Sequence, residues 1–119
     1  MNQIKSNPSI KKIALPTLDE IVILNMDDII YCEGDSNYTN VFLGDGTKLC
    51  LAKTLKVLEE FLPEDSYFRI HNTHIVNLNR IVRILRRDSG YITMDNGKEL
   101  AISRSRREDF FKKINLLKE

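Results

Sequence analysis

The chain of 119 residues is poor in several residue types: it has no tryptophan, three prolines, two histidines and only two cysteines. Two cysteines are too few for the disulfide framework of a small secreted domain. Cys32 and Cys50 each lie in an alternation of apolar and polar residues, which predicts two buried, reduced thiols in a cytoplasmic protein. No apolar run approaches the roughly 20 residues that cross a membrane, and the first residues lack the apolar core of a secretory signal. No membrane partner is therefore expected.

Metal binding and catalysis find little support in the sequence. His71 and His74 are the only histidines, and in one strand their spacing would point them to opposite faces. A structural zinc site needs four ligands, and the lone cysteines do not supply the missing pair. The chain also lacks the GxSxG, P-loop and GxGxxG motifs, and nothing near either cysteine would activate it. We expect no enzyme, no metal site and no cofactor.

The net charge of +1 hides an asymmetry along the chain. Residues 1–68 hold 6 Lys and Arg against 11 Asp and Glu, a balance of −5, whereas residues 69–119 hold 12 against 6, a balance of +6. Such a distribution is typical of a protein that meets a polyanion on one side, although a solvated basic surface without a partner has the same pattern. The arginines from which phosphate contacts would be drawn are Arg69, Arg83, Arg86, Arg87, Arg106 and Arg107.

The apolar pattern predicts one mostly β domain over residues 10–119, preceded by a flexible leader or linker at residues 1–9. Short apolar runs are separated by turn signals every eight to twelve residues. Asp45-Gly46 and Asn96-Gly97 each lie between two such runs, which predicts two hairpins with type I′ turns. Pro16 marks an edge position in the first strand.

Two short helices are expected between and after the strands. Thr54 is a good N-cap for a helix that buries Leu55, Leu58, Phe61 and Leu62 and ends before Pro63. Ser105 and Glu108 form a capping-box pattern for a second helix. Its expected buried stripe is Phe110, Phe111, Ile114 and Leu117. With Ser105 as N-cap, Ser103 and Arg104 would lie in the connection between the preceding strand and this helix, which regular structure holds at both ends.

The segment "FRIHNTHIVNLNRI" over residues 68–81 places many hydrogen-bonding side chains among apolar ones. Asparagine, threonine and arginine are the side chains that commonly contact base edges and phosphates. For Asn72, Thr73 and Arg104 we favour contact with nucleic acid. For His71, Asn77 and Asn79 we favour structural roles, as a bonded core histidine and as turn or cap residues. Arg69 alternates with Phe68 and Ile70, so it can also turn toward an internal acid.

These residues resemble the LytTR-type DNA-binding domain. The resemblance rests on "FLPEDSYFRIHNTHIVNLNRI" followed about twenty residues later by "LAISRSR", with "IIYCEGDSNYTNVFLGDG" and "TLKVLEEFLP" upstream, and it covers about residues 10–117. The family implies elongated antiparallel β-sheets with two short helices, which bind double-stranded DNA through loops. Its members are usually output domains of bacterial response regulators, with a receiver domain ahead. They bind tandem or imperfect repeats, often as homodimers.

The resemblance also implies where DNA is contacted. It adds the loop of Asn37, Tyr38, Thr39 and Asn40 to the two segments that the charge pattern indicates. The full expected set is Asn37, Tyr38, Thr39, Asn40, Asn72, Thr73, His74, Arg83, Arg86, Arg87, Ser103, Arg104, Arg106 and Arg107. Many family members carry Arg or Lys in place of Asn72, so the base preference here is expected to differ.

Two other functions are compatible with the sequence. A protein–protein interaction module could use an exposed sheet edge and its basic half against an acidic partner. RNA binding would favour exposed aromatic side chains for stacking, and the chain is only 8% aromatic. We therefore expect a sequence-specific DNA-binding domain of a transcriptional regulator, either attached to a receiver or sensor domain or free-standing.

Overall fold

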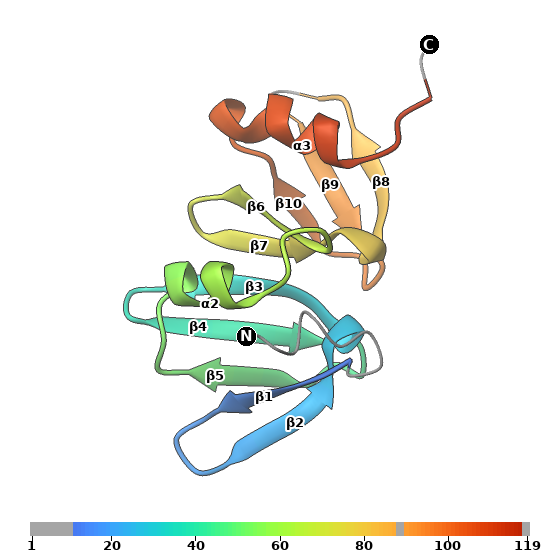
Figure 1. Ribbon diagram of the computed structural model, residues 1–119. Helices are drawn as coiled ribbons and strands as arrows, with labels where there is room; N and C mark the ends of the chain where they lie inside the picture. The colour runs from blue at the N-terminus through green and yellow to red at the C-terminus, as the bar shows by residue number, and fades with distance from the viewer. Residues whose placement is uncertain (1–10, 88–89, 118–119) are drawn as a thin grey trace.

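The computed structural model describes residues 11–87 and 90–117, so the predicted leader at residues 1–9 lies outside the described residues. Strands in three antiparallel sheets make up most of it, together with two short α-helices, which confirms the predicted fold class. A five-stranded sheet has the order β5-β4-β3-β7-β6, a three-stranded sheet the order β10-β9-β8, and β1 pairs with β2 (Figure 1). The strands are β1 Lys12–Pro16, β2 Ile21–Asn25, β3 Ile29–Asp35, β4 Tyr38–Leu43, β5 Lys48–Leu51, β6 Tyr67–His71, β7 His74–Asn77, β8 Ile81–Leu85, β9 Tyr91–Met94 and β10 Glu99–Ala101.

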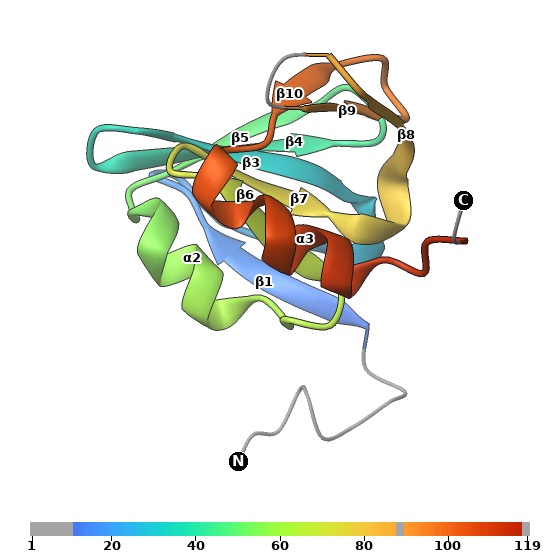
Figure 2. The ribbon, with the colours of Figure 1, turned by 90° about the horizontal axis from the view of Figure 1, so that it is seen from above.

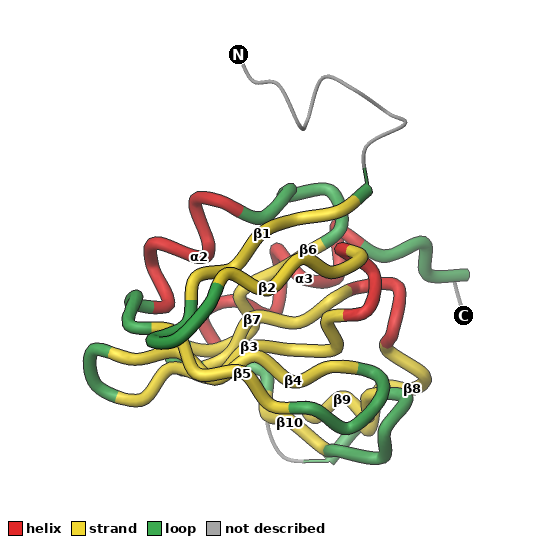
Figure 3. Tube along the Cα trace, turned by 90° about the horizontal axis from the view of Figure 1, so that it is seen from below, coloured by secondary structure: helices red, strands yellow, loops and turns green. Residues whose placement is uncertain are grey.

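The five-stranded sheet separates two hydrophobic cores. On one face, residues of β1, β2 and the helix α2 (Leu55–Phe61) pack against Cys32, Val41 and Ile75. On the other face, the three-stranded sheet and the helix α3 (Arg107–Lys113) pack against Tyr31 and Val76. Figure 3 shows the β1–β2 ribbon and the β9–β10 hairpin on opposite sides of the central sheet. Adjacent residues of β3 and β7 therefore serve different cores.

The two predicted hairpins form, but their turns are not type I′. A type I′ turn needs positive φ at both central residues. Here only the glycine of each pair has it, with φ of 92° at Gly46 and 89° at Gly97. Leu43 N–H donates to Thr47 O and Gly46 N–H to Leu43 O, which describes a three-residue loop with a left-handed glycine. The Asp45 carboxylate accepts from Thr47 N–H, a local bond that aspartate makes readily and that favours this longer loop.

The first helix follows the prediction closely and the second does not. Thr54 caps α2 by accepting from Val57 N–H, and Leu62 is already extended before Pro63. Phe61 is 41% exposed, so it does not belong to the buried face. The Ser105–Glu108 capping box is wrong, because a 3₁₀ turn η3 (Arg104–Arg106) precedes α3 and α3 has no side-chain cap. Leu117 is 88% exposed because α3 ends at Lys113, before the predicted stripe is complete.

The two cysteines differ in environment, which corrects half of the thiol prediction. Both are free; Cys32 is buried at the centre of β3, and burial raises the pKa of its thiol to about 12. Cys50 is exposed, because β5 turns Leu49 and Leu51 inward and so turns Cys50 outward. Within residues 11–87 and 90–117, no helix is long and apolar enough to cross a membrane.

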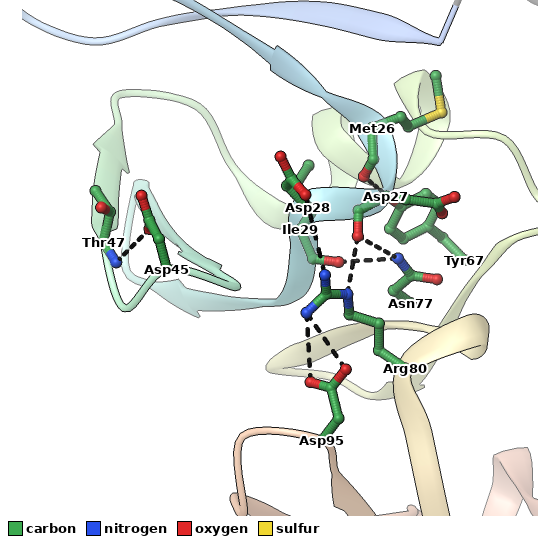
Figure 4. A network of polar contacts seen from close by, with 10 residues as sticks. All are labelled: Met26, Asp27, Asp28, Ile29, Asp45, Thr47, Tyr67, Asn77, Arg80 and Asp95. Atoms are coloured by element: carbon green, nitrogen blue, oxygen red, sulfur yellow. Dashed lines mark hydrogen bonds and ion pairs between the residues drawn. The ribbon is translucent and has the colours of Figure 1, made fainter.

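Arg80 connects the central sheet to the three-stranded sheet (Figure 4). Arg80 Nε donates to Asp27 O at 2.9 Å, and its guanidinium lies 3.3 Å from the Asp95 carboxylate on the β9–β10 loop. The 3₁₀ turns η1 (Met26–Asp28) and η2 (Leu78–Arg80) bring these groups together. A Cβ atom at Gly44 would lie 2.8 Å from Arg80 Nη1, so a side chain at position 44 would require this guanidinium to move.

Asn77 is fully buried within the same network. Its Nδ2 donates to Ile29 O at 2.9 Å, and its Oδ1 accepts from Asn79 N–H at 3.0 Å. The structural role predicted for Asn77, as a cap residue, is confirmed, because it is the N-cap of η2.

Replacing Asn77 by alanine should lower the free energy of unfolding by about 1–3 kcal/mol, because the bonded groups would stay buried without a partner. Urea unfolding followed by circular dichroism measures this change. Asn79→Ala is the matched control, since the Asn79 side chain is exposed and only its backbone N–H is used. Equal losses in the two variants would show that the buried amide contributes nothing specific.

Candidate nucleic-acid interface

Three loops meet at one end of the molecule, at the turn ends of β3–β4 and β6–β7 and at the start of η3 (Figure 2). Antiparallel pairing of β3 with β7 sets Glu33 opposite His74 and so brings the first two turns to the same edge. Gly34 N–H donates to Thr73 O at 2.9 Å, which continues this ladder into the turns. Ser103 N–H donates to Ile70 O at 2.8 Å and ties η3 to β6. The three loops therefore form one continuous surface, which we call the loop surface.

The turn between β6 and β7 consists of Asn72 and Thr73, both exposed. Arg69 Nη2 donates to Asn72 O at 2.6 Å, and Arg69 Nη1 is paired with Glu59 of α2 at 2.9 Å. Arg106 Nη2 donates to Asn72 Oδ1 at 3.3 Å. Arg69 thus points toward an acid, as its alternation with apolar residues allowed. The guanidinium groups of Arg69 and Arg106 both hold the β6–β7 turn by hydrogen bonds to Asn72.

The turn between β3 and β4 contributes Asn37 and Tyr38 as exposed side chains. Ser36 has a φ of 58° and is the only non-glycine residue with positive φ in the described chain. Such strain is concentrated at functional sites in proteins. Thr39 does not face the solvent as expected: it is fully buried and donates to Lys53 O at 2.7 Å, because β4 turns it toward the core. Asn40 is partly buried and lies opposite Glu33 in the sheet.

The third loop carries Ser103 and Arg104. Arg104 is exposed and lies in η3, not in the irregular connection that the capping box implied. Its backbone is nevertheless held, because Ser103 is bonded to β6 and Arg106 N–H donates to Ser103 O at 3.0 Å. The Ser103 hydroxyl is buried and has no hydrogen-bond partner among the described residues. The segment of Ser103 and Arg104 is thus held by other elements, as expected, although the predicted helix start is wrong.

His71 and His74 lie on the same side of the sheet, contrary to the expectation from their spacing. They do not share one strand: they are directly opposite each other across the β6–β7 turn, with ring centroids 6.2 Å apart. Thr73 Oγ1 lies within hydrogen-bonding distance, 2.9 Å, of Nδ1 of both rings. His74 Nε2 lies 3.3 Å from a Glu33 carboxylate oxygen. This chain links the β6–β7 turn to β3.

His74 is half-buried, and burial lowers its pKa below the ordinary histidine value, with the Glu33 carboxylate acting in the opposite direction. Its position under Thr73 makes it a support for the turn more than an exposed contact. Within residues 11–87 and 90–117 there is no group of three or more His, Cys, Asp or Glu side chains that could hold a metal ion.

The remaining arginines divide by location. Arg83 is exposed on β8, which lies at the end of the molecule away from the β3–β4 turn (Figures 1 and 2). Arg87 is paired with Glu99 and lies 5.0 Å from the centre of the Tyr91 ring, so it is held on the three-stranded sheet. Arg86 is exposed next to it. Arg107 is half-buried against Gly90. The structure therefore brings Arg106 to the loop surface and leaves Arg83, Arg86 and Arg87 on another part of the molecule.

Comparison with known proteins agrees with this geometry. Residues 19–115 match the sequence profile of the LytTr DNA-binding domain. The chain belongs to the LytTR family. The solved structure of a LytTr DNA-binding domain from Bacillus cereus, from a protein described as a methyl-accepting/DNA response regulator, superposes with a TM-score of 0.75 at 28% identity. That match covers 87% of this chain and 95% of the other.

Curated relatives of this LytTR domain are longer proteins. The sensory transduction protein LytT of Bacillus subtilis is 30% identical over 88% of this chain, and the heme-containing CO-sensing transcriptional regulator RcoM 1 of Paraburkholderia xenovorans is 31% identical over 80%. The chain spans 44% and 36% of these two proteins. Similar sequences thus occur in a sensory transduction protein and in a CO-sensing transcriptional regulator.

The lowered pKa of His74 predicts a pH dependence of stability. Because the unfolded chain binds this proton more tightly than the folded one, stability contributed by neutral His74 is present at pH 7.5 and is lost as the pH falls below about 6.5. We expect wild type to lose more unfolding free energy between pH 7.5 and 5.5 than His74→Gln does. Denaturant titrations at the two pH values test this, and equal losses in both proteins would contradict it.

Proposed function

We propose that this LytTR domain binds specific sequences in double-stranded DNA through its loop surface and acts as the DNA-binding part of a bacterial transcriptional regulator. The observation that carries the proposal is that hydrogen bonds join the three loops to one another. As a result, the exposed residues Asn37, Asn72 and Arg104 share one surface. Amide and guanidinium groups are the side-chain groups that most often contact bases in the major groove. No catalytic role and no cofactor are part of the proposal.

The proposed contacts fall into two classes. Asn72 and Arg104 contact base edges, because each is exposed on a backbone that other elements hold. The register is fixed by contacts of Asn37, Tyr38 and Thr73 to the DNA backbone. Ser103, whose hydroxyl is buried, holds the third loop in place through its backbone bond to β6. The candidates for phosphate contacts are Arg83, Arg86, Arg87 and Arg107. The first three lie away from the loop surface, so they would contact only DNA that extends beyond the loops. Thr39, Asn40 and His74 support the loops from inside.

The longer relatives suggest that the domain is one part of a larger regulatory protein. We propose that it serves as the output domain of a cytoplasmic regulator, with a receiver or sensor part elsewhere in the protein. Binding to tandem or imperfect DNA repeats as a homodimer would suit one domain of this size, because each copy presents a single loop surface.

A protein partner is a second candidate function for a different surface. The face of the β1–β2 ribbon turned away from the core exposes Ile21 (67%) and Ile23 (66%), and the adjoining loop exposes Leu18 (88%). Neighbouring exposed aliphatic side chains favour contact with another protein surface. This surface lies apart from the loop surface, so both functions are compatible.

Duplex binding should weaken with salt in a defined way. If about 4–6 phosphates are neutralised, the logarithm of the binding constant should fall against the logarithm of salt concentration with a slope of about −4 to −5. Fluorescence anisotropy with a duplex from the regulator's own promoter region, between 50 and about 300 mM salt, measures the slope. A slope near zero would favour the protein-partner function instead.

Arg104→Ala should reduce specificity more than Arg107→Ala does. Losing a bidentate base contact costs about 1–3 kcal/mol on the cognate site and little on random DNA, whereas a lost phosphate contact weakens both alike. Arg104 is exposed at the loop surface and Arg107 is half-buried against Gly90, in the first turn of α3. Both variants are measured on cognate and scrambled duplexes. If Arg104→Ala weakens both duplexes by the same factor, Arg104 contacts phosphate only.

A further inference from the structure

The side-chain amide of Asn72 has a fixed orientation. Arg106 Nη2 donates to its oxygen at 3.3 Å, and Arg106 Nη1 donates to Arg69 O at 3.4 Å. An arginine side chain has donors only, so the Asn72 atom that faces it must be the acceptor Oδ1. The Nδ2 amino group is therefore the end of the amide that is not engaged by Arg106.

The backbone that carries this amide is also fixed. Asn72 O accepts from Arg69, Arg69 is anchored to Glu59 of α2, and Thr73 O accepts from Gly34 N–H of β3. The turn is thus held from α2, from β3 and, through Arg106, from the start of α3. A contact group held in this way binds without the ordering cost that a free side chain has.

We propose that Arg106 is a positioning residue that sets the base preference of Asn72 to guanine. This inference rests on the proposed function of the loop surface. Bidentate recognition of adenine needs Asn Oδ1 to accept from the adenine N6 amino group while Nδ2 donates to N7. Arg106 uses one of the two lone pairs of Oδ1 and turns this oxygen toward itself, so that Asn72 offers its two N–H donors to the DNA. Guanine offers two adjacent acceptors, N7 and O6, whereas adenine sets an amino donor beside its N7.

The same geometry removes Arg106 from the set of phosphate contacts. Its guanidinium is half-buried, and two of its nitrogens donate to protein oxygens. Arg106 therefore acts on DNA through Asn72 and not by its own charge.

Selection from a randomised duplex library tests the proposal, with the base preference at each position as the readout. Wild type should select guanine at the position whose preference Asn72→Ala abolishes. Arg106→Met removes the donors but keeps an aliphatic stem, and it should shift that one position toward adenine by at least about fivefold. Arg106→Lys retains a donor and should keep guanine. Lys112→Met is the matched control, because it removes one exposed cation from α3 and should leave every position unchanged.

A second variant does not depend on removing Arg106. In Asn72→Asp one carboxylate oxygen would face Arg106 and the other would face the DNA as an acceptor, so the position should change from guanine to cytosine, whose N4 amino group is a donor. Selection of adenine by wild type, or an unchanged preference in Arg106→Met with a salt slope flatter by about one unit, would overturn the proposal. Absence of any sequence preference in wild type would instead contradict the proposed function itself.

Discussion

The antiparallel pairing of β3 with β7 is the contact on which the candidate interface depends. These strands are far apart in the sequence, yet their pairing sets Glu33 opposite His74 and brings two turns to one edge. The third loop joins through the backbone bond from Ser103 to Ile70 and through Arg106, which donates to Arg69 and Asn72. A slip of one residue between β3 and β7 would exchange the two cores and separate the loops, because side chains alternate between the faces of a sheet. The hydrophobic pattern of both strands therefore fixes the interface as well as the fold.

Function in this domain follows from support beneath the loops as much as from the exposed side chains. The exposed groups of the β6–β7 turn, Asn72 and Thr73, rest on Arg69, Arg106 and the two histidines. Several basic side chains are paired with acids of the same chain, as Arg69 is with Glu59 and Arg80 with Asp95. A count of basic residues consequently overstates how many are offered to a nucleic acid.

Sequence patterns predicted the strands and the first helix, because alternation, turn residues and an N-cap are local signals. Of the candidate site, charge and residue type indicated Asn72, Thr73 and Arg104, whereas the loop of residues 37–40 was expected from the family resemblance alone. They failed where a longer-range contact decided the outcome. The Ser105–Glu108 pattern gave way to a 3₁₀ turn in which Ser103 is bonded to β6, and the spacing of His71 and His74 misled because a turn separates them. Asp45 and Asn96 each accept from a backbone N–H two residues on, which produced three-residue loops instead of type I′ turns. Alternation indicated that Arg69 could turn toward an acid, but the identity of that acid, Glu59, and the role of Arg106 depend on the tertiary structure.

Gly44 has a consequence for how this sequence can vary. It lies in a hairpin loop, where substitution is usually tolerated. Yet any Cβ at this position would meet the Arg80 guanidinium at 2.8 Å, in the place where Arg80 joins the central sheet to the three-stranded sheet. A side chain at position 44 would therefore have to displace this guanidinium and disturb its bonds to Asp27 and Asp95. The cost of replacing this loop glycine thus depends on how firmly Arg80 joins the two sheets.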